Sequence, residues 1–240
     1  MNILVTGGAS GLGAAITKRL AADTNNNIYF TYNKSRDAAK KTEAELTNST
    51  SIKCDFTNTA ELKSLIDKMP QLDLDVLINN AYTGEFLKSH FHKIPSDVFL
   101  SDFKENVIPV IEITQSAISS FRKKKLGKII TILTSALAET PPVGSSVYIA
   151  NKGYLEKLTK VWAAENGKFN ITSISVSPSF MRTNLTASID ERLVEQIKEN
   201  QPHKKLLTVE DVADVVFSLV NSSELLNGTD VLLNAGTNFK

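Results

Sequence analysis

A glycine-rich loop near the N-terminus constrains the fold more than any other segment. Residues 6–13 read Thr-Gly-Gly-Ala-Ser-Gly-Leu-Gly, after an apolar run from Ile3 to Val5 and before an amphipathic stretch from Ala14 to Ala22. Strand, glycine turn and helix in this order form a cradle for phosphate, because glycines allow close backbone approach and the helix N-terminus presents free N–H groups. The spacing differs from the common dinucleotide fingerprint. We predict a dinucleotide-binding unit; the alternative is a turn without a ligand.

The composition is that of one globular domain covering residues 1–240. The chain is 42% hydrophobic and 22% charged, with a net charge of +1 that gives no reason to expect nucleic acid as a partner. A lone cysteine, Cys54, and the absence of a Cys/His cluster argue against a disulfide or a metal. His90 and His92 are interpreted as solvent-facing loop residues. No apolar run has transmembrane length, so we expect a cytoplasmic protein without a membrane partner.

Five further short apolar runs alternate with helical patterns along the chain. Alternation of this kind predicts an α/β fold in which a doubly wound, mostly parallel sheet has helices on both faces. A long helix is expected from Ser96 to Phe121, disturbed one turn before Pro109. The expected strands cover residues 28–32, 51–55, 74–78, 128–133 and 171–176.

The end of the second predicted strand bears on the choice of coenzyme. A site for NAD usually has an acidic residue here, which bonds the ribose 2′-hydroxyl. In this chain Tyr32-Asn33-Lys34-Ser35-Arg36 follows instead, and the first carboxylate is Asp37. Donors without a competing carboxylate favour the 2′-phosphate of NADP(H) over NAD(H). Alternatively, Lys34 and Arg36 only decorate a helix that Ser35 caps.

Polar residues also follow the third and fourth predicted strands. Asp55 is expected to accept a hydrogen bond from an adenine amine, and Phe56 to line the ring; alternatively Asp55 caps the next helix. Asn79-Asn80-Ala81 follows the fourth strand, where doubly wound sheets bind ligands. The alternative for these asparagines is that they satisfy backbone groups at the end of the strand.

Tyr148 and Lys152 are four residues apart in Tyr-Ile-Ala-Asn-Lys. If the segment from Ser146 is helical, both side chains lie on one face. An ordinary tyrosine has a pKa of about 10, and a nearby cation favours the phenolate. The two residues are interpreted as a proton-transfer pair. The alternative is a half-buried tyrosine beside a solvated lysine.

These motifs, in this order, resemble the short-chain dehydrogenase/reductase family over essentially the whole chain. The resemblance rests on the glycine loop, Asp55, Asn79-Asn80-Ala81, Asn106, Ser135, Tyr148-x-x-x-Lys152, Ser177-Pro178 and Thr183. It implies a single-domain, Rossmann-like, seven-stranded sheet. The implied catalytic residues are Asn106, Ser135, Tyr148 and Lys152. The expected cofactor-binding residues are Gly7, Ser10, Gly11, Leu12, Gly13, Tyr32, Asn33, Lys34, Ser35, Asp55, Phe56, Asn80, Ala81, Tyr148, Lys152, Pro178 and Thr183.

The narrower similarity is to 3-oxoacyl-carrier-protein reductases. It implies NADPH-dependent reduction of a small or carrier-linked ketone, with Tyr148 as general acid, Ser135 bonded to the carbonyl oxygen and Lys152 on the ribose. Asn106 would hold a backbone carbonyl and a water near Lys152. A homotetramer or homodimer is implied through two long helices. The alternatives are an NAD-dependent dehydrogenase of a sugar, polyol or other secondary alcohol, and a non-catalytic dinucleotide binder.

Five features concern the substrate more than the chemistry. Tyr82 and Ser179 stand where the family usually has glycine, and Asn234-Ala235 replaces a commoner Asp-Gly pair. The polar segment 184–205 is predicted to be a lid over the substrate. The basic run Arg122–Lys128 suits the end of a helix, where Gly127 would follow the last turn. A second hypothesis makes this run a docking patch for an acidic carrier protein near the site entrance.

Overall fold

The structure, a computed structural model, describes residues 1–86, 88–187 and 189–237. Within them one sheet of seven strands, all parallel, has the order β3-β2-β1-β4-β5-β6-β7. The predicted α/β class, the doubly wound sheet and the single domain are confirmed. The strands are β1 Asn2–Val5, β2 Asn27–Tyr32, β3 Ser49–Lys53, β4 Val76–Asn79, β5 Gly127–Ile132, β6 Ile171–Pro178 and β7 Asp230–Leu233.

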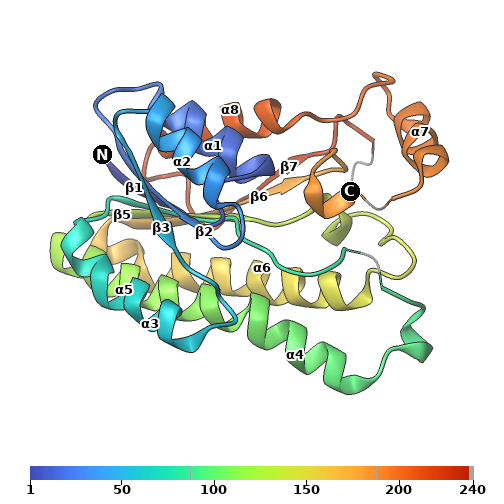
Figure 1. Cartoon of the computed structure of the whole chain (residues 1–240), viewed down its shortest axis with the longest axis horizontal. Coiled ribbons are helices and arrows are strands. Elements are labelled where there is room, and N and C mark those ends of the chain that lie inside the picture. The colour runs from blue at the N-terminus through green and yellow to red at the C-terminus, as the bar shows by residue number, and fades with distance from the viewer. Residues whose placement is uncertain (87, 188, 238–240) are drawn as a thin grey trace.

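Helices cover both faces of the sheet (Figure 1). One face carries α1 Gly11–Ala21, α2 Arg36–Glu45 and α8 Val209–Val220. The other carries α3 Thr59–Lys68, α4 Ser96–Asn106, α5 Ile108–Lys124 and α6 Ser146–Asn166. A further helix, α7 Glu191–Asn200, lies to one side, beyond the ends of the strands.

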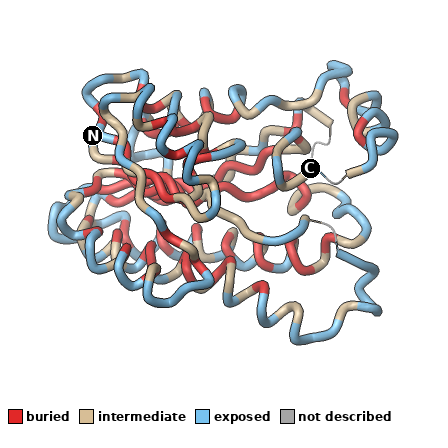
Figure 2. The backbone as a smooth tube through the Cα atoms, viewed as in Figure 1, coloured by how far each residue is buried: buried red, intermediate tan, exposed pale blue. Residues whose placement is uncertain are grey.

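Two apolar cores, one on each face, fix the sheet between the helices. Figure 2 shows the buried residues concentrated on the strands and on the helix faces turned toward them. On the α1 and α8 side the core includes Ile16, Phe30 and Val216. On the opposite side it includes Leu65 and Phe121. Because these strands are apolar on both faces, they read as continuous apolar runs in the sequence.

The predicted long helix from Ser96 is two helices. α4 ends at Asn106 and α5 begins at Ile108, with Pro109 in its first turn. Proline has no N–H to donate and its ring clashes with the preceding turn, so the helix is interrupted before it, as expected, although at Val107, two residues ahead of Pro109. The break leaves Asn106 buried at the end of α4 with its side chain available for tertiary contacts.

The structure corrects the interpretation of Gly127. The residue that ends α5 in the left-handed conformation is Lys125, with φ of +54°. Gly127 instead begins β5, where a Cβ would lie 2.2 Å from the Cγ of Phe121. The glycine is therefore required by close packing of the α5 ring against the strand, and not by the helix end.

The residues predicted to be functional gather at the carboxyl ends of the strands. β3 ends at Lys53, two residues earlier than predicted, so Asp55 lies in the following loop. The chain order reverses between β1 and β4, which are neighbours. In such sheets a crevice forms outside the carboxyl ends of the strands at this point. None of the helices in the described part of the chain combines the length and apolar character that a membrane crossing requires.

Candidate active site

A cavity of about 1070 Å³ opens at the carboxyl ends of the strands. This is at the upper end of the usual range for ligand sites, enough for a dinucleotide and a small second ligand. Its wall brings together the glycine loop, the ends of β2 to β6 and segment 179–201. Of the residues predicted from the sequence, every proposed cofactor contact and Ser135 line it, whereas Asn106 does not.

The glycine loop has the geometry of a phosphate cradle. Gly7 and Gly11 have φ of +67° and +51°, which side chains rarely tolerate. A Cβ on Gly13 would lie 2.1 Å from the carbonyl oxygen of Gly7, so the first turn of α1 packs directly on the loop. The cavity then meets the N-terminus of α1, where free N–H groups favour an anion. The residues present therefore fit a dinucleotide pyrophosphate.

Two neighbouring strands hold the loop in place. The Gly7 N–H donates to Thr31 Oγ1 at 2.9 Å, from β2. Asn80 Nδ2 donates to the Thr6 carbonyl at 3.0 Å, and Thr6 Oγ1 accepts from the N–H groups of Asn80 and Ala81. Asn80 thus satisfies backbone groups at the strand end and also faces the cavity. Its structural role and its predicted contact with a ligand are therefore compatible.

The end of the cavity beside β2 and β3, called the far end below, is lined by the segment Tyr32–Ser35 together with Asp55 and Phe56. Asp55 does not cap α3, because that cap is Asn58, whose Oδ1 accepts from two backbone N–H groups. Asp55 accepts instead from Thr57 N–H, which with the Thr57 hydroxyl and the Asn33 amide lowers its pKa. Ser35 precedes α2 without a side-chain capping bond.

Tyr148 and Lys152 lie on the first turns of α6 and both face the cavity. Lys152 Nζ is 5.7 Å from the centroid of the Tyr148 ring and donates to the Ile132 carbonyl at 2.7 Å. Burial lowers the pKa of Lys152 to about 8. Burial also raises the pKa of Tyr148 to about 12, against a hydrogen bond with the Thr134 side chain. Desolvation thus dominates the pKa of Tyr148 in this structure, and its expected lowering by Lys152 together with the nicotinamide charge stays a prediction.

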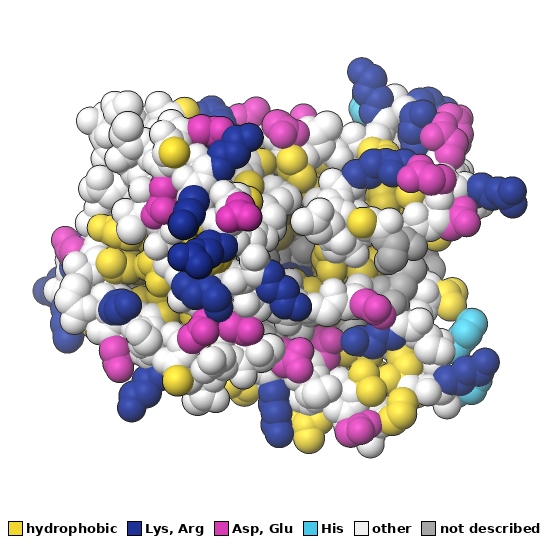
Figure 3. Space-filling view, in the orientation of Figure 1, with side chains coloured by type: hydrophobic (Ala, Val, Ile, Leu, Met, Phe, Trp, Pro, Cys, Tyr) yellow, Lys and Arg dark blue, Asp and Glu magenta, His cyan; other side chains and the backbone are white. Residues whose placement is uncertain are grey.

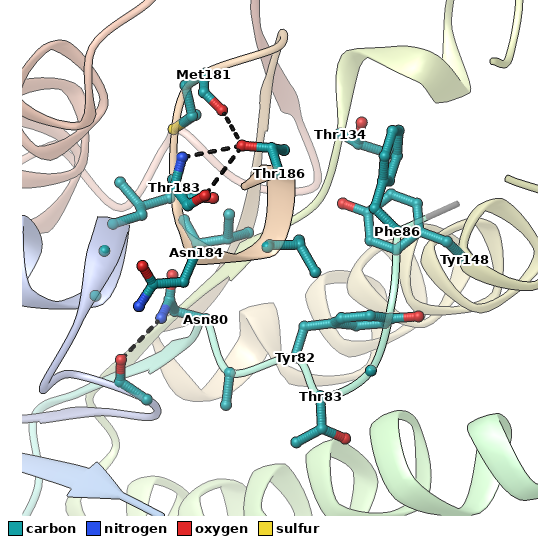
Figure 4. A pocket seen from close by; sticks show the side chains of 18 of the residues that line it. Asn80, Tyr82, Thr83, Phe86, Thr134, Tyr148, Met181, Thr183, Asn184 and Thr186 are labelled. Carbon is teal, nitrogen blue, oxygen red and sulfur yellow. Dashed lines mark hydrogen bonds between the residues drawn. The ribbon is translucent and has the colours of Figure 1, made fainter. Parts of the chain in front are cut away.

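Ser135 begins a short 3-10 turn that two residues separate from the end of β5, thirteen residues before Tyr148. It is 3% exposed and its Oγ donates to Glu139 Oε2 at 3.2 Å. Thr134, the residue before it, lies beside the Tyr148 ring in Figure 4. Thr134 was not among the predicted site residues, and its position directly before Ser135 was the only signal for it.

Comparison with known proteins identifies the family. A family model described as enoyl-(acyl carrier protein) reductase matches residues 7–238. Acetoacetyl-CoA reductase of Shinella zoogloeoides is 30% identical, with 98% of each chain covered. The 3-oxoacyl-(acyl-carrier-protein) reductase MabA of Mycobacterium tuberculosis is 27% identical over 98% of this chain and 92% of that protein.

The chain belongs to the short-chain dehydrogenase/reductase family. It is accordingly an NAD(P)-dependent oxidoreductase. A short-chain dehydrogenase of Burkholderia cenocepacia in complex with NADP superposes with a TM-score of 0.87 at 27% identity, covering 99% of this chain and 98% of that one.

In this short-chain dehydrogenase/reductase Asn106 lies behind the cavity wall. Its Oδ1 accepts from the Thr83 N–H at 2.7 Å, and its Nδ2 donates to the Thr83 carbonyl at 3.1 Å. The same Nδ2 lies 3.1 Å from Asp102 Oδ1. Asn106 therefore holds the loop after β4 at Thr83, next to Tyr82, whose ring packs on Tyr148, and its described bonds do not include one to Lys152. The expected hydrogen bond from Asn106 to a backbone carbonyl is present, and the carbonyl is that of Thr83.

Tyr82, in place of the family's usual glycine, adds an aromatic wall. Its φ is not positive, so a residue with a side chain is accommodated without strain. Figure 4 shows the rings of Tyr82 and Phe86 against Tyr148. Both ring centroids lie 5.0 Å from that of Tyr148, edge to face. Such pairs are favourable and hold the phenol in a fixed orientation.

Segment 184–205 contains a helix with an apolar stripe that sequence reasoning missed. Leu193 and Ile197 on α7, with Ile189 before the helix and the polar Gln201 after it, are spaced by four residues and all line the cavity. Their helical spacing was the available signal, obscured by the charged residues between them. Figure 3 shows those charges, of both signs, gathered over α7 at the upper right. Ser188 lies outside the described residues.

The basic run Arg122–Lys128 is not near the site entrance. It lies at the end of α5 and the start of β5, at the amino ends of the strands, opposite the cavity. Lys124 Nζ pairs with Asp75 at 2.7 Å, and Arg122 Nε donates to Asn166 at 2.8 Å. Lys128 Nζ is buried and donates to carbonyls at the end of α8. The carrier-docking hypothesis for this run is therefore wrong.

Proposed function

We propose that the protein uses NADPH to reduce the ketone of a 3-oxoacyl compound, or of a similar carbonyl compound, to a secondary alcohol. The observation that carries the proposal is that one cavity joins the glycine cradle to Tyr148, Ser135 and Lys152. A protein that only bound the dinucleotide would have no use for a buried phenol at the reactive end. The sequence relatives named above are reductases of 3-oxoacyl and acetoacetyl thioesters, which supports this substrate class.

Tyr148 would act as the general acid. Burial raises the pKa of its phenol to about 12, so the group is protonated at neutral pH and ready to donate. When bound, the nicotinamide supplies the hydride. Tyr148 would protonate the oxygen of the reacting carbonyl, and Ser135 would donate a hydrogen bond to the same oxygen. A protonated phenol favours reduction, since oxidation requires it to accept a proton.

Lys152 and Asn106 would orient these groups. Lys152 has three donors, of which one is bonded to the Ile132 carbonyl. The others would bind the ribose hydroxyls of the coenzyme. Asn106 would fix the backbone at Thr83 and order the water that returns a proton to the site. The contacts of Asn106 with Thr83, at 2.7 and 3.1 Å, support the first of these roles.

NADP(H) is the proposed coenzyme. Lys34 and Ser35 line the far end of the cavity, and segment 32–36 contains no carboxylate to repel a 2′-phosphate. A cation and a hydroxyl at this position are suitable donors for phosphate. The solved relative in complex with NADP, at 27% identity, supports the same choice.

Segment 184–205 would close over the substrate. The apolar stripe of α7 turns toward the cavity, and Gln201 is tied to the C-terminal segment by Thr237 Oγ1 at 2.7 Å. Arg182 bridges to Glu191 at the start of α7. Closure of an apolar surface excludes water from the site and strengthens the electrostatic contacts within it.

A homodimer or homotetramer is also proposed. Tyr154 and Val161 on α6 are 45% and 44% exposed, although the helix is otherwise largely buried on its sheet side. The two residues are seven positions apart on α6 and so lie on the same face, and an exposed apolar face of this kind suits contact with a second copy. Sedimentation of the purified chain would reveal the oligomer.

The direct test is a substrate and coenzyme panel. Purified protein should oxidise NADPH when given ethyl acetoacetate or acetoacetyl-CoA, and should prefer NADPH to NADH. A clear preference for NAD, with oxidation of a sugar or polyol and no reduction of 3-oxo compounds, would establish the alternative dehydrogenase. Tight coenzyme binding without turnover of any carbonyl compound or alcohol would establish a non-catalytic binder.

A further inference from the structure

A carboxylate stands directly beside the proposed reacting centre. Glu139 lies one turn after Ser135 and lines the cavity. Its Oε2 accepts from Ser135 Oγ at 3.2 Å, and its Oε1 accepts from Asn234 Nδ2 at 2.9 Å. One oxygen is thus held by a neighbour in the same turn and the other by a residue near the C-terminus, which fixes the position of the charge.

The cavity offers little positive charge to offset this carboxylate. Among the described residues that line it, the cations are Lys34 and Lys152. Lys34 lies at the coenzyme end, whereas the Lys152 ammonium is buried and bonded to the Ile132 carbonyl. Apolar side chains form much of the remaining wall, including those of Phe86 and Leu193. The Lys152 ammonium and the Glu105 carboxylate also line the cavity, but Glu139 is the carboxylate whose hydrogen bond with Ser135 holds it at the proposed reacting centre.

We propose that Glu139 makes the site select neutral 3-oxo compounds, such as esters and thioesters, against free 3-oxo acids. This selectivity rests on the function proposed above. The ketone oxygen must come within hydrogen-bond distance of Ser135 Oγ, and Ser135 is bonded to Glu139. In a free 3-oxo acid the carboxylate is only two carbons from the ketone carbon, so two like charges meet within several ångströms.

Neutral acyl groups escape this repulsion. An ester or thioester has no charge at the position where the acid has one, and its carbonyl fits an apolar wall. At a spacing of several ångströms near a protein surface, repulsion between two unit charges changes binding by about 10- to 100-fold. Because the effect is electrostatic, added salt weakens it.

The test compares ethyl acetoacetate with acetoacetate, each with NADPH and the full chain. Wild-type protein should favour the ester at least 10-fold in kcat/KM, and Glu139→Gln should reduce that preference about 10-fold. Glutamine keeps the length of the side chain and an oxygen that accepts from Ser135. Glu139→Asp retains the charge and should retain the preference, which separates loss of charge from disturbance of the turn.

Glu85→Gln is the matched control, because Glu85 is an exposed carboxylate next to Phe86 that does not line the cavity. It should leave the ratio of ester to acid unchanged. The wild-type ratio should also fall as ionic strength rises.

Three outcomes distinguish the claims. The proposed role of Glu139 is overturned, and the proposed function left standing, by either of two results. One is an ester-to-acid ratio of kcat/KM near one in the wild-type protein. The other is the same ratio in wild type and Glu139→Gln. No reduction of any 3-oxo compound would overturn the proposed function and this selectivity with it. An ester-to-acid ratio that stays high in Glu139→Asp and falls in Glu139→Gln would support both the proposed reduction and the selectivity set by Glu139.

Discussion

The hydroxyl of Tyr82 donates a hydrogen bond of 3.0 Å to Asp102, a carboxylate that is only 5% exposed. The ring of Tyr82 packs edge to face on Tyr148, with centroids 5.0 Å apart. Tyr82 therefore places a ring beside the proposed general acid, and Asp102 accepts the bond from its hydroxyl. Asp102 therefore positions the proposed general acid indirectly, through the Tyr82 ring.

Asp102 also joins three other parts of the structure. Its Oδ1 accepts from the amide groups of Asn106 and Asn151, at 3.1 and 2.8 Å. Lys88 Nζ lies 3.4 Å from its Oδ2. Replacing Asp102 by alanine removes the acceptor of the Tyr82 hydroxyl and of the Asn151 amide, whereas Asn106 keeps the Thr83 carbonyl. Each donor left unsatisfied at a buried site costs about 1 to 3 kcal/mol.

We therefore expect Asp102→Ala to lower the free energy of unfolding by about 3 kcal/mol or more. Tyr82→Phe removes one hydroxyl and leaves the other partners of Asp102 in place, so its expected cost is about 1 kcal/mol. Urea unfolding followed by fluorescence measures both. Equal losses in the two variants would show that Asp102 does not organise this cluster.

Tyr148→Phe tests the proposed general acid. Loss of the proton donor should reduce kcat for ketone reduction by roughly 100-fold or more. The phenyl ring keeps the edge-to-face contacts with Tyr82 and Phe86, so NADPH affinity should be nearly unchanged. Steady-state kinetics and fluorescence titration of NADPH are the measurements. Unchanged turnover in the variant would refute the role of Tyr148.

Lys34→Glu tests the choice of coenzyme. A carboxylate at the far end of the cavity should repel a 2′-phosphate and accept a bond from a 2′-hydroxyl, so the preference for NADPH over NADH should fall by about 10-fold or more. Lys40→Glu makes the same charge change on α2, away from the cavity, and is the control. Equal effects of the two substitutions would show that only net charge matters.

Lys152 makes folding stability depend on pH. Burial lowers its pKa from 10.5 to about 8, so between these values the unfolded chain holds a proton that the folded protein has released. The unfolded state binds more protons in this window, and stability therefore rises with pH there. The destabilising effect of the buried charge is complete below pH 8 and disappears above 10.5.

Lys152→Met removes this titration. The free energy of unfolding of wild type relative to Lys152→Met should increase by an amount on the order of 3 kcal/mol across the window. Denaturant unfolding at several pH values from 7.5 to 10.5 measures the difference, and comparison with the variant cancels the titration of other groups. A difference that does not vary with pH would show that Lys152 is not desolvated.

The sequence by itself predicted the class of the fold and the residues around the cavity. Local patterns were sufficient, because a glycine loop between strand and helix and Tyr148 four residues before Lys152 each depend on neighbours in the chain. The break before Pro109 followed in the same way from backbone chemistry. The catalytic and binding roles of these residues remain predictions.

Which groups meet across the chain depends on how the chain folds, and no local pattern records it. Glu139 reaches Asn234, 95 residues away, and Asp102 collects donors from Tyr82 and Asn151. No local spacing records such contacts. The raised pKa of Tyr148 likewise depends on burial by several segments, and the basic run at Arg122–Lys128 lies far from the site because α5 runs toward the amino ends of the strands. Sequence patterns predict elements and motifs, but burial and long-range contacts set the charge and shape of the site.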